Sequence, residues 1–494
     1  MFGSYAKGQL LQHLTAEATV YGVILIGSRL GAFFLLPFYL AFLTPEDFGV
    51  IGIVLIAQGA LVPLFGLGLH DAVQRYYHGW LENERPERLG EIWICVFIWS
   101  FLLCGALTAG HKIFDLLFKQ VGSMPYFVLG LWTAFFTTLI VVCLSVLRIR
   151  GELKYFAYAS FGMFVTQSAI SLFLVGVMLM GAVGYLLGGL FSSAIWAVIL
   201  CIQFWRDASP SWSMQKLREI LSYSLPLIPT TILDGTIGMF DRYFLDHYVP
   251  LSSIGFYNLA NQFGSVVVAA NQSIKSAWFP FVYRIMQDRK DTATIISQFS
   301  FYYVAVLLPP SLLVALLSRE VIEVFGERYL ESYRFIPWFV LAVYLQAVTS
   351  ALGRGLDLAK KNIHWPIISC VHVTASLSAL GYLVPAYGAM GAAWSIVISA
   401  AVRAAFQIVL AHRVYPRPFN GIRLLMLWSS GLGMFWLGSC VTGDSLSLNV
   451  ALKLTVVIAG TIATAVLLLE RSSLLLLRSW LSRKLMRETD CTTR

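Results

Sequence analysis

The chain has 494 residues, of which 58% are hydrophobic and only 12% are charged. So little polar surface leaves no room for a soluble domain of any size, which excludes most classes of soluble enzyme. The net charge of +9 would suit a nucleic-acid-binding protein, but the cations are spread over many short connections, so nucleic acid is not an expected partner.

Fourteen apolar stretches, most of them about 20 residues long, follow one another between positions 19 and 469. A run of that length spans the hydrocarbon core of a bilayer as an α-helix. We therefore predict an all-α polytopic membrane protein with 14 transmembrane helices. In chain order the predicted spans are 19–42, 49–69, 92–110, 125–147, 157–180, 184–203, 221–244, 254–277, 297–318, 335–353, 363–383, 389–411, 424–440 and 450–469.

The positive charges between these spans are unevenly shared by the two sides. One set of connections, together with both ends of the chain, carries 25 of the 35 Lys and Arg residues. The opposite set carries only a few, among them Lys112, Lys119, Arg319 and Arg328. Because cytoplasmic connections are the ones enriched in Lys and Arg, we predict that both termini lie in the cytoplasm. The longest connection on the opposite side, 319–333, is expected to be a loop.

Three short motifs recur at an offset of 204 to 207 residues, which indicates an internal duplication. The pairs are 44–49 with 250–255, 150–153 with 354–357, and 181–184 with 388–391. A repeat of six helices enters the membrane in the same direction twice, so the two copies should be related by an axis along the membrane normal. Two such lobes are typical of alternating-access transporters, whose substrate site lies between them near the midplane.

The duplication predicts a division of the chain into six parts. These are a cytoplasmic leader (1–18), an N-lobe (19–203), a cytoplasmic linker (204–220), a C-lobe (221–411), an accessory helix pair (412–469) and a basic cytoplasmic tail (470–494).

Several motifs at the start of each lobe resemble those of Wzx-type polysaccharide flippases, in the multidrug/oligosaccharidyl-lipid/polysaccharide exporter superfamily. They are SRL (28–30), LPFY (36–39) and LTPEDFG (43–49) in the first lobe, and YSLP (223–226), DRYFL (241–245) and IGFYNLA (254–260) in the second. The resemblance implies that an undecaprenyl-diphosphate-linked oligosaccharide, a surface-polysaccharide or O-antigen repeat unit, is flipped from the cytoplasmic to the periplasmic leaflet. No covalent chemistry and no cofactor are implied.

The resemblance also implies a location and partners. The protein would lie in the bacterial inner membrane, with the lipid-linked oligosaccharide, the bilayer and polysaccharide polymerase or assembly proteins as partners. Lipid II flippases of the same superfamily have fourteen helices, of which the last two form a groove for the lipid tail. By similarity, the pair at 412–469 would do the same.

Charged side chains in the middle of a span are costly and usually face an aqueous cavity or a partner. Arg29 and Asp234 lie at middle depth in the equivalent first and seventh spans, which favours a shared central cavity. The guanidinium of Arg29 suits a diphosphate or an acidic sugar, but Arg29 could instead pair with Asp71 or Asp234 and only hold helices together. Asp234 could exchange protons in an antiporter, or cap a helix or pair with an arginine. Further candidates for the cavity are Asp241, Arg242, Lys275 and Arg403.

A polar run in the eighth span offers a second set of candidates. Asn258, Asn261 and Gln262 share one helix face, a spacing that suits sugar hydroxyls and equally suits hydrogen bonds between helices. Tyr257 beside them is expected to anchor the span at the membrane interface. Asp71 and Arg75, one helical turn apart, are interpreted as a structural ion pair or a cytoplasmic gate.

Two other functions are compatible with part of this pattern. A cation-coupled drug exporter of the multidrug and toxin extrusion type would share the fold, but would have twelve helices and an acid-rich cavity. A membrane-embedded polymerase or glycosyltransferase would need a sizeable extramembrane catalytic loop that bears carboxylates or basic residues, and the connections on the outer side are short. The seven cysteines and eight histidines show no metal-ligand spacing, so no metal site is expected.

Overall fold

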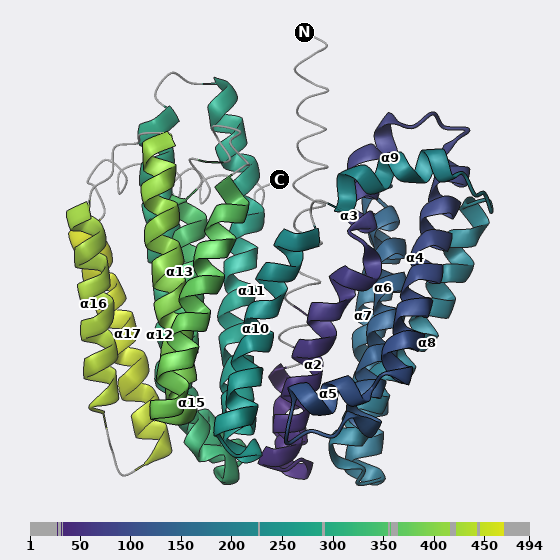
Figure 1. Ribbon diagram of the computed structural model, residues 1–494. Helices are drawn as coiled ribbons and strands as arrows, with labels where there is room; N and C mark the ends of the chain where they lie inside the picture. The colour runs from purple at the N-terminus through teal and green to yellow at the C-terminus, as the bar shows by residue number, and fades with distance from the viewer. Residues whose placement is uncertain are drawn as a thin grey trace, which may run out of the picture.

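The structure is a computed structural model that describes residues 27, 31, 33–225, 228–288, 292–353, 356, 364–414, 421–441 and 445–468. Regular secondary structure in these ranges is helical throughout, without a strand. The helices form two groups that lie side by side, with α2 and α10 at their junction (Figure 1). The two groups are close together at the end where α5 lies, and they spread apart toward the end where α9 lies (Figure 1). We call these the α5 end and the α9 end.

The first group, here the N group, precedes the linker helix α9 (Met214–Ser224). It comprises the helix Phe33–Phe42, α2 (Pro45–Gly66), α3 (Leu69–Tyr76), η1 (Tyr77–Gly79), α4 (Arg85–Ala109), α5 (Lys112–Leu117), η2 (Ser123–Phe127), α6 (Val128–Ile149), α7 (Leu153–Leu172), η3 (Phe173–Val177) and α8 (Gly181–Asp207).

The second group, here the C group, follows α9. It comprises α10 (Ile228–Tyr248), α11 (Leu251–Asp288), α12 (Thr292–Phe325), η5 (Glu327–Arg334), α13 (Ile336–Leu352), α15 (His364–Val414), α16 (Gly421–Ser439) and α17 (Leu446–Leu468).

Eight described helices are long and apolar enough to span a membrane, or nine if η5 and α13 are counted together as one bent span. The chain is therefore a multi-pass membrane protein, while the count of fourteen spans stays a prediction. The first half of the first predicted span lies largely outside the described residues, and its second half forms the helix Phe33–Phe42. The eleventh and twelfth fall within the single 51-residue helix α15, which breaks at Gly388 (φ 59°, ψ −136°). A Cβ on Gly391 would touch the backbone of Leu383, eight residues earlier, although an unbroken helix would separate them by about 12 Å. The helix thus folds back on itself at Gly388.

Two predicted boundaries are wrong. The seventh predicted span begins at Leu221, but residues 221–224 belong to α9. This helix buries Leu217, Ile220 and Ser224 on one face, the pattern of an amphipathic helix lying on a surface. The connection 319–333 is predicted to be a loop, but α12 continues to Phe325 and η5 follows it.

The turn at the start of α2 shows how local sequence sets the fold. Thr44 is the N-cap of α2, and the Thr44 hydroxyl accepts a hydrogen bond from the backbone N–H of Asp47 (3.2 Å) while the Asp47 carboxylate accepts one from the N–H of Thr44 (3.0 Å). This is a capping box, with Pro45 at the first helical position, where its missing N–H costs nothing. The same carboxylate accepts a hydrogen bond from the N–H of Ala182 (3.0 Å), which fixes the start of α8 beside the start of α2.

Candidate functional site

A cavity of about 310 Å³ lies between the N group and the C group. The helix Phe33–Phe42, α2, α7 and α8 line it on one side, and α11 lines it on the other. The lining alternates aromatic and aliphatic side chains with polar ones, which is typical of a site for an amphipathic ligand. Its polar lining residues are Tyr39, Gln167, Ser168, Tyr185, Asn258, Gln262 and Ser265.

Only part of the polar run in the eighth predicted span lines this cavity. Asn258 and Gln262 line it, whereas Asn261 is not among the lining residues. Asn258 also donates a hydrogen bond to the backbone oxygen of Phe48 (3.1 Å), and its amide packs against Gly52, so it joins α11 to α2. Gln262 lies eleven residues into α11, roughly 16 Å along the helix axis, which is near the middle of a hydrocarbon core about 30 Å thick.

Hydrogen bonds join the two groups at the α5 end. The buried carboxylate of Asp246, in the last turn of α10, accepts hydrogen bonds from the backbone N–H groups of Lys119 and Gln120 (3.2 Å for Gln120). The Gln120 side chain donates to the backbone oxygens of Asp246 (2.5 Å) and Val249 (2.8 Å). We call this set of contacts the Asp246 latch.

Close backbone packing closes the same end. A Cβ on Gly49 of α2 would collide with the backbone oxygen of Leu251, and a Cβ on Gly255 of α11 would collide with that of Pro45. Only glycine allows such an approach at these two positions. Beside them the hydroxyl of Tyr329 in η5 donates a hydrogen bond to the backbone oxygen of Leu43 (2.8 Å).

Asp241 and Arg242, two candidates for the cavity, are instead buried inside the C group. They are 4% and 2% exposed, and neither is among the residues that line the cavity. The Tyr257 hydroxyl donates to Asp241 (3.3 Å), and the Arg242 guanidinium lies 4.7 Å from the centre of the Tyr257 ring. The expectation that Tyr257 anchors the membrane interface is wrong, because its ring is wholly buried between Arg242 and Phe339.

Of the remaining intramembrane candidates, the two that the structure describes, Arg403 and Lys275, do not line the cavity. The Nη1 atom of Arg403 is 3.1 Å from Nδ1 of His372, so this contact joins the two segments of α15 on either side of Gly388. Lys275 is half-buried in α11 and is not among the lining residues. Arg29 and the side chain of Asp234 lie outside the described part of the chain, so their roles stay predictions.

Asp71 and Arg75 do not pair with each other among the described ion pairs. Asp71 lies 3.5 Å from the ring nitrogen of His70. The Arg75 guanidinium stacks on Tyr223 of α9, 4.7 Å from the ring centre. An exposed cation gains more from a flat aromatic neighbour than from a solvated carboxylate one turn away. Arg75 thus holds the linker helix to α3, and the role of the two residues as a gate stays a prediction.

Two groups of polar residues were missed by the sequence analysis. One is the Asp246 latch, whose aspartate looks like an ordinary helix-end residue in the sequence. The other is a buried ion pair between Glu320 of α12 and Lys453 of α17. Lys453 lies inside the fourteenth predicted span, and a lysine within an apolar span is a sign in the sequence that a buried partner is present. Among the described residues, no group of three or more His, Cys, Asp or Glu side chains could hold a metal ion.

Comparison with known families gives the chain its relatives. The profile of the family described as polysaccharide biosynthesis protein matches residues 40–334, more than half of the chain. The chain belongs to the polysaccharide biosynthesis protein family. The predicted relationship to Wzx-type flippases is thus confirmed at the level of the family. No curated protein matches the chain in sequence.

Solved structures show that this polysaccharide biosynthesis protein has the fold of known transporters. The lipid II flippase MurJ in an inward closed conformation superposes with a TM-score of 0.72 at 15% identity, covering 92% of this chain and 98% of that one. The MATE multidrug transporter DinF-BH gives a TM-score of 0.55 at 14% identity, covering 82% and 95%. Identities this low show a shared fold and leave the substrate open.

Proposed function

We propose that this protein is a transporter that flips an undecaprenyl-diphosphate-linked oligosaccharide, a surface-polysaccharide repeat unit, from the cytoplasmic to the periplasmic leaflet by alternating access. The observation that carries the proposal is a partly polar cavity between two helix groups, sealed at one end by contacts that join the groups. Membership of a polysaccharide biosynthesis family supplies the substrate class. On this proposal the chain moves its substrate without making or breaking a covalent bond, so it is not an enzyme.

The division into two repeated lobes, 19–203 and 221–411, is part of this proposal. Gly181 and Gly388, which are equivalent in the predicted repeat, both have positive φ (56° and 59°). Gly181 is the first residue of α8, and Gly388 is the break in α15 after which the chain folds back. Gly49 and Gly255, also equivalent, make reciprocal contacts with the start of each other's helix. Reciprocal contacts of equivalent residues are what a two-fold relation between the lobes produces.

The orientation follows from the cation bias. If both termini are cytoplasmic, the α9 end faces the cytoplasm and the Asp246 latch closes the periplasmic end. The structure would then be an inward-facing state, in which a lipid-linked substrate enters from the cytoplasmic leaflet. Opening the latch while the α9 end closes would release the substrate to the periplasmic leaflet. The helix pair α16 and α17, at the edge of the C group, would accompany the C-lobe.

Within the cavity we assign sugar recognition to Gln262 and Asn258, whose amides can donate to and accept from hydroxyls. Arg29, in the same span as the cavity-lining helix Phe33–Phe42, is assigned to the diphosphate, because a guanidinium binds two phosphate oxygens at once. Asp234 is the proposed site of proton coupling. These assignments depend on the proposed function.

Deletion and complementation in the host test this function. A deletion strain should accumulate lipid-linked repeat units in the cytoplasmic leaflet and lose surface polysaccharide. Gln262→Ala should reduce export at normal membrane abundance, while Asn261→Ala, one residue earlier and outside the cavity, should not. Arg29→Ala should abolish export and Arg29→Lys should restore it in part. Normal surface polymer in the deletion strain, or increased drug sensitivity as its sole phenotype, would overturn the proposal in favour of another substrate.

A further inference from the structure

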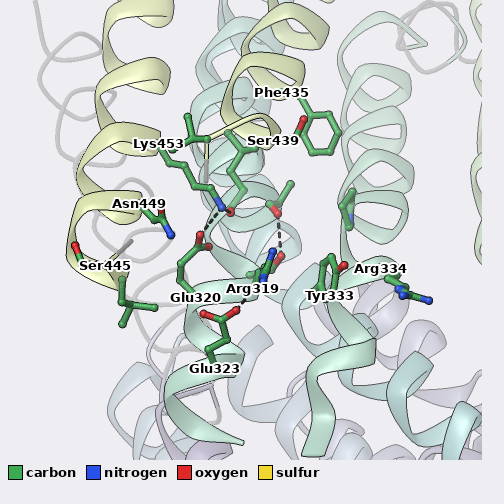
Figure 2. A pocket seen from close by; sticks show the side chains of 16 residues that line it. Arg319, Glu320, Glu323, Tyr333, Arg334, Phe435, Ser439, Ser445, Asn449 and Lys453 are labelled. Carbon is green, nitrogen blue, oxygen red and sulfur yellow. Dashed lines mark hydrogen bonds and ion pairs between the residues drawn. The ribbon is translucent and has the colours of Figure 1, made fainter. Parts of the chain in front are cut away.

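A second cavity, of about 630 Å³, lies at the α5 end of the C group. It shares no lining residue with the cavity between the groups. Four helix ends meet around it: α12 ends, α13 begins after η5, α16 ends and α17 begins (Figure 2). Its size is that of a ligand site, and nothing in the transport mechanism uses it.

The floor of this cavity holds the Glu320–Lys453 ion pair (Figure 2). Both residues are buried, at 4% and 6% exposed. The Lys453 ammonium donates to Oε1 of Glu320 and to the backbone oxygen of Leu316 (3.0 Å). The second oxygen of Glu320, Oε2, is buried and has no hydrogen-bond partner among the described residues. A buried carboxylate oxygen without a donor is costly, so it calls for a donor from a ligand.

The rim of the cavity supplies positive charge. Arg319 is already paired with Glu323 (2.8 Å). Arg334, which is exposed on η5, forms no ion pair within the described ranges. Lys453 has three N–H donors and two acceptors here, which leaves one donor for a ligand. The cavity therefore presents an unused acceptor on a carboxylate together with unused donors on two cations.

The cavity lies near the start of α17, at one end of the helix bundle. Lys453 lies seven residues into α17, roughly 10 Å along its axis. A helix that begins at the outer surface of the headgroup layer, about 5 to 8 Å thick, would place Lys453 just below that layer, within reach of a headgroup. Outside the cavity, α16 exposes large apolar side chains such as Leu432 and Trp436, on which acyl chains can lie.

We propose that this cavity binds the headgroup of a phospholipid that carries a phosphate and a primary ammonium, as phosphatidylethanolamine does. The ammonium donates to Oε2 of Glu320, and the phosphate accepts from Arg334 and from the third N–H of Lys453. Phosphatidylcholine has no N–H to donate, and phosphatidylglycerol has no cation to place beside Glu320. The cavity shares no lining residue with the one between the two groups, so the site is distinct from the proposed transport pathway.

The first test measures lipid preference with the purified full-length protein in detergent. Native mass spectrometry with dioleoyl phosphatidylethanolamine, phosphatidylcholine and phosphatidylglycerol at equal concentrations should retain the first lipid best. Soluble glycerophosphoethanolamine should bind much more weakly, because it lacks the acyl chains. Equal retention of the three lipids would overturn the proposal. Binding of the soluble headgroup as tight as that of the lipid would overturn the assignment to a lipid.

The second test locates the site. Arg334→Gln should weaken phosphatidylethanolamine binding roughly tenfold or more, the effect of losing one charge-assisted hydrogen bond. Arg328→Gln is the matched control, because Arg328 is exposed on the same short helix but does not line the cavity. Glu320→Gln should remove the preference over phosphatidylcholine. If Arg334→Gln and Arg328→Gln bind the lipid equally well, the proposal is wrong, whatever Glu320→Gln does to folding.

Discussion

Replacing Asp246 by asparagine should open the α5 end of the protein. In the closed state the two carboxylate oxygens of Asp246 accept hydrogen bonds from the separate backbone N–H groups of Lys119 and Gln120. Asparagine has one acceptor oxygen, and its NH₂ group would face the other backbone N–H. The closed state thus loses at least one charge-assisted hydrogen bond, whereas an open state, with the N–H groups in water, loses nothing.

The size of the effect follows from the hydrogen bonds involved. One hydrogen bond to a charged group contributes about 1.5 to 3 kcal/mol, which changes the ratio of open to closed molecules roughly 10-fold to 150-fold. If the open state is populated at about 1% in the parent protein, its population should rise to roughly 10 to 60% in Asp246→Asn.

Pulsed electron paramagnetic resonance can measure this population. Spin labels at Leu116 of α5 and Glu331 of η5, both exposed and on different groups, report the separation at the α5 end in a background without the seven native cysteines. A longer distance should appear in Asp246→Asn. Asp115→Asn is the matched control, because Asp115 accepts hydrogen bonds from the N–H (2.7 Å) and hydroxyl (2.9 Å) of Ser123 within the N group. An unchanged distance distribution in Asp246→Asn would refute the reasoning.

Single contacts give three further predictions. Gly255→Ala should destabilise the closed α5 end by about 1 to 3 kcal/mol, because the new Cβ would collide with backbone atoms of Pro45. Gly59→Ala is the control, because its Cβ would meet nothing within 4 Å, and the same spin labels report both variants. Lys453→Met should lower the free energy of unfolding by about 3 to 5 kcal/mol, because it strands a buried carboxylate, and adding Glu320→Gln should recover most of the loss in denaturant titrations. Hydrogen bonds from Ser123 hold the pKa of Asp115 below its ordinary value. The stability that they give the α5 loop is fully present above the unfolded pKa of about 4, and it is lost as the pH falls through the lower folded pKa. The mobility of a spin label at Leu116 should therefore increase only at acidic pH, and Asp115→Asn should remove that pH dependence.

Much of the architecture could be predicted because the bilayer makes secondary structure a local property. A backbone in hydrocarbon must satisfy its own hydrogen bonds, so an apolar run such as 92–110 becomes a helix, observed as α4, whatever its neighbours are. The turn at Thr44 was visible for the same reason, since a capping box needs only residues three apart. The boundary at Leu221 was missed because an amphipathic helix and the span after it read as one apolar stretch.

The candidate site was predicted only in outline. The polar face of α11 pointed to a cavity, and Asn258 and Gln262 do line one. Asp241, Arg242 and Tyr257 form a cluster of their own because α10 and α11 turn these side chains toward each other inside the C group. Periodicity places a residue on a helix face, but it does not say which helix covers that face.

What the sequence by itself determined was the all-helical, apolar character of the chain and its family, because these depend on composition and on motifs a few residues long. The tertiary structure decided which polar groups meet. Asp246 and Gln120 are 126 residues apart in sequence, and Glu320 and Lys453 are 133 apart. Contacts at that separation depend on how whole helices pack. The free-energy cost of burying a charge is low or high according to the partner that this packing places beside it.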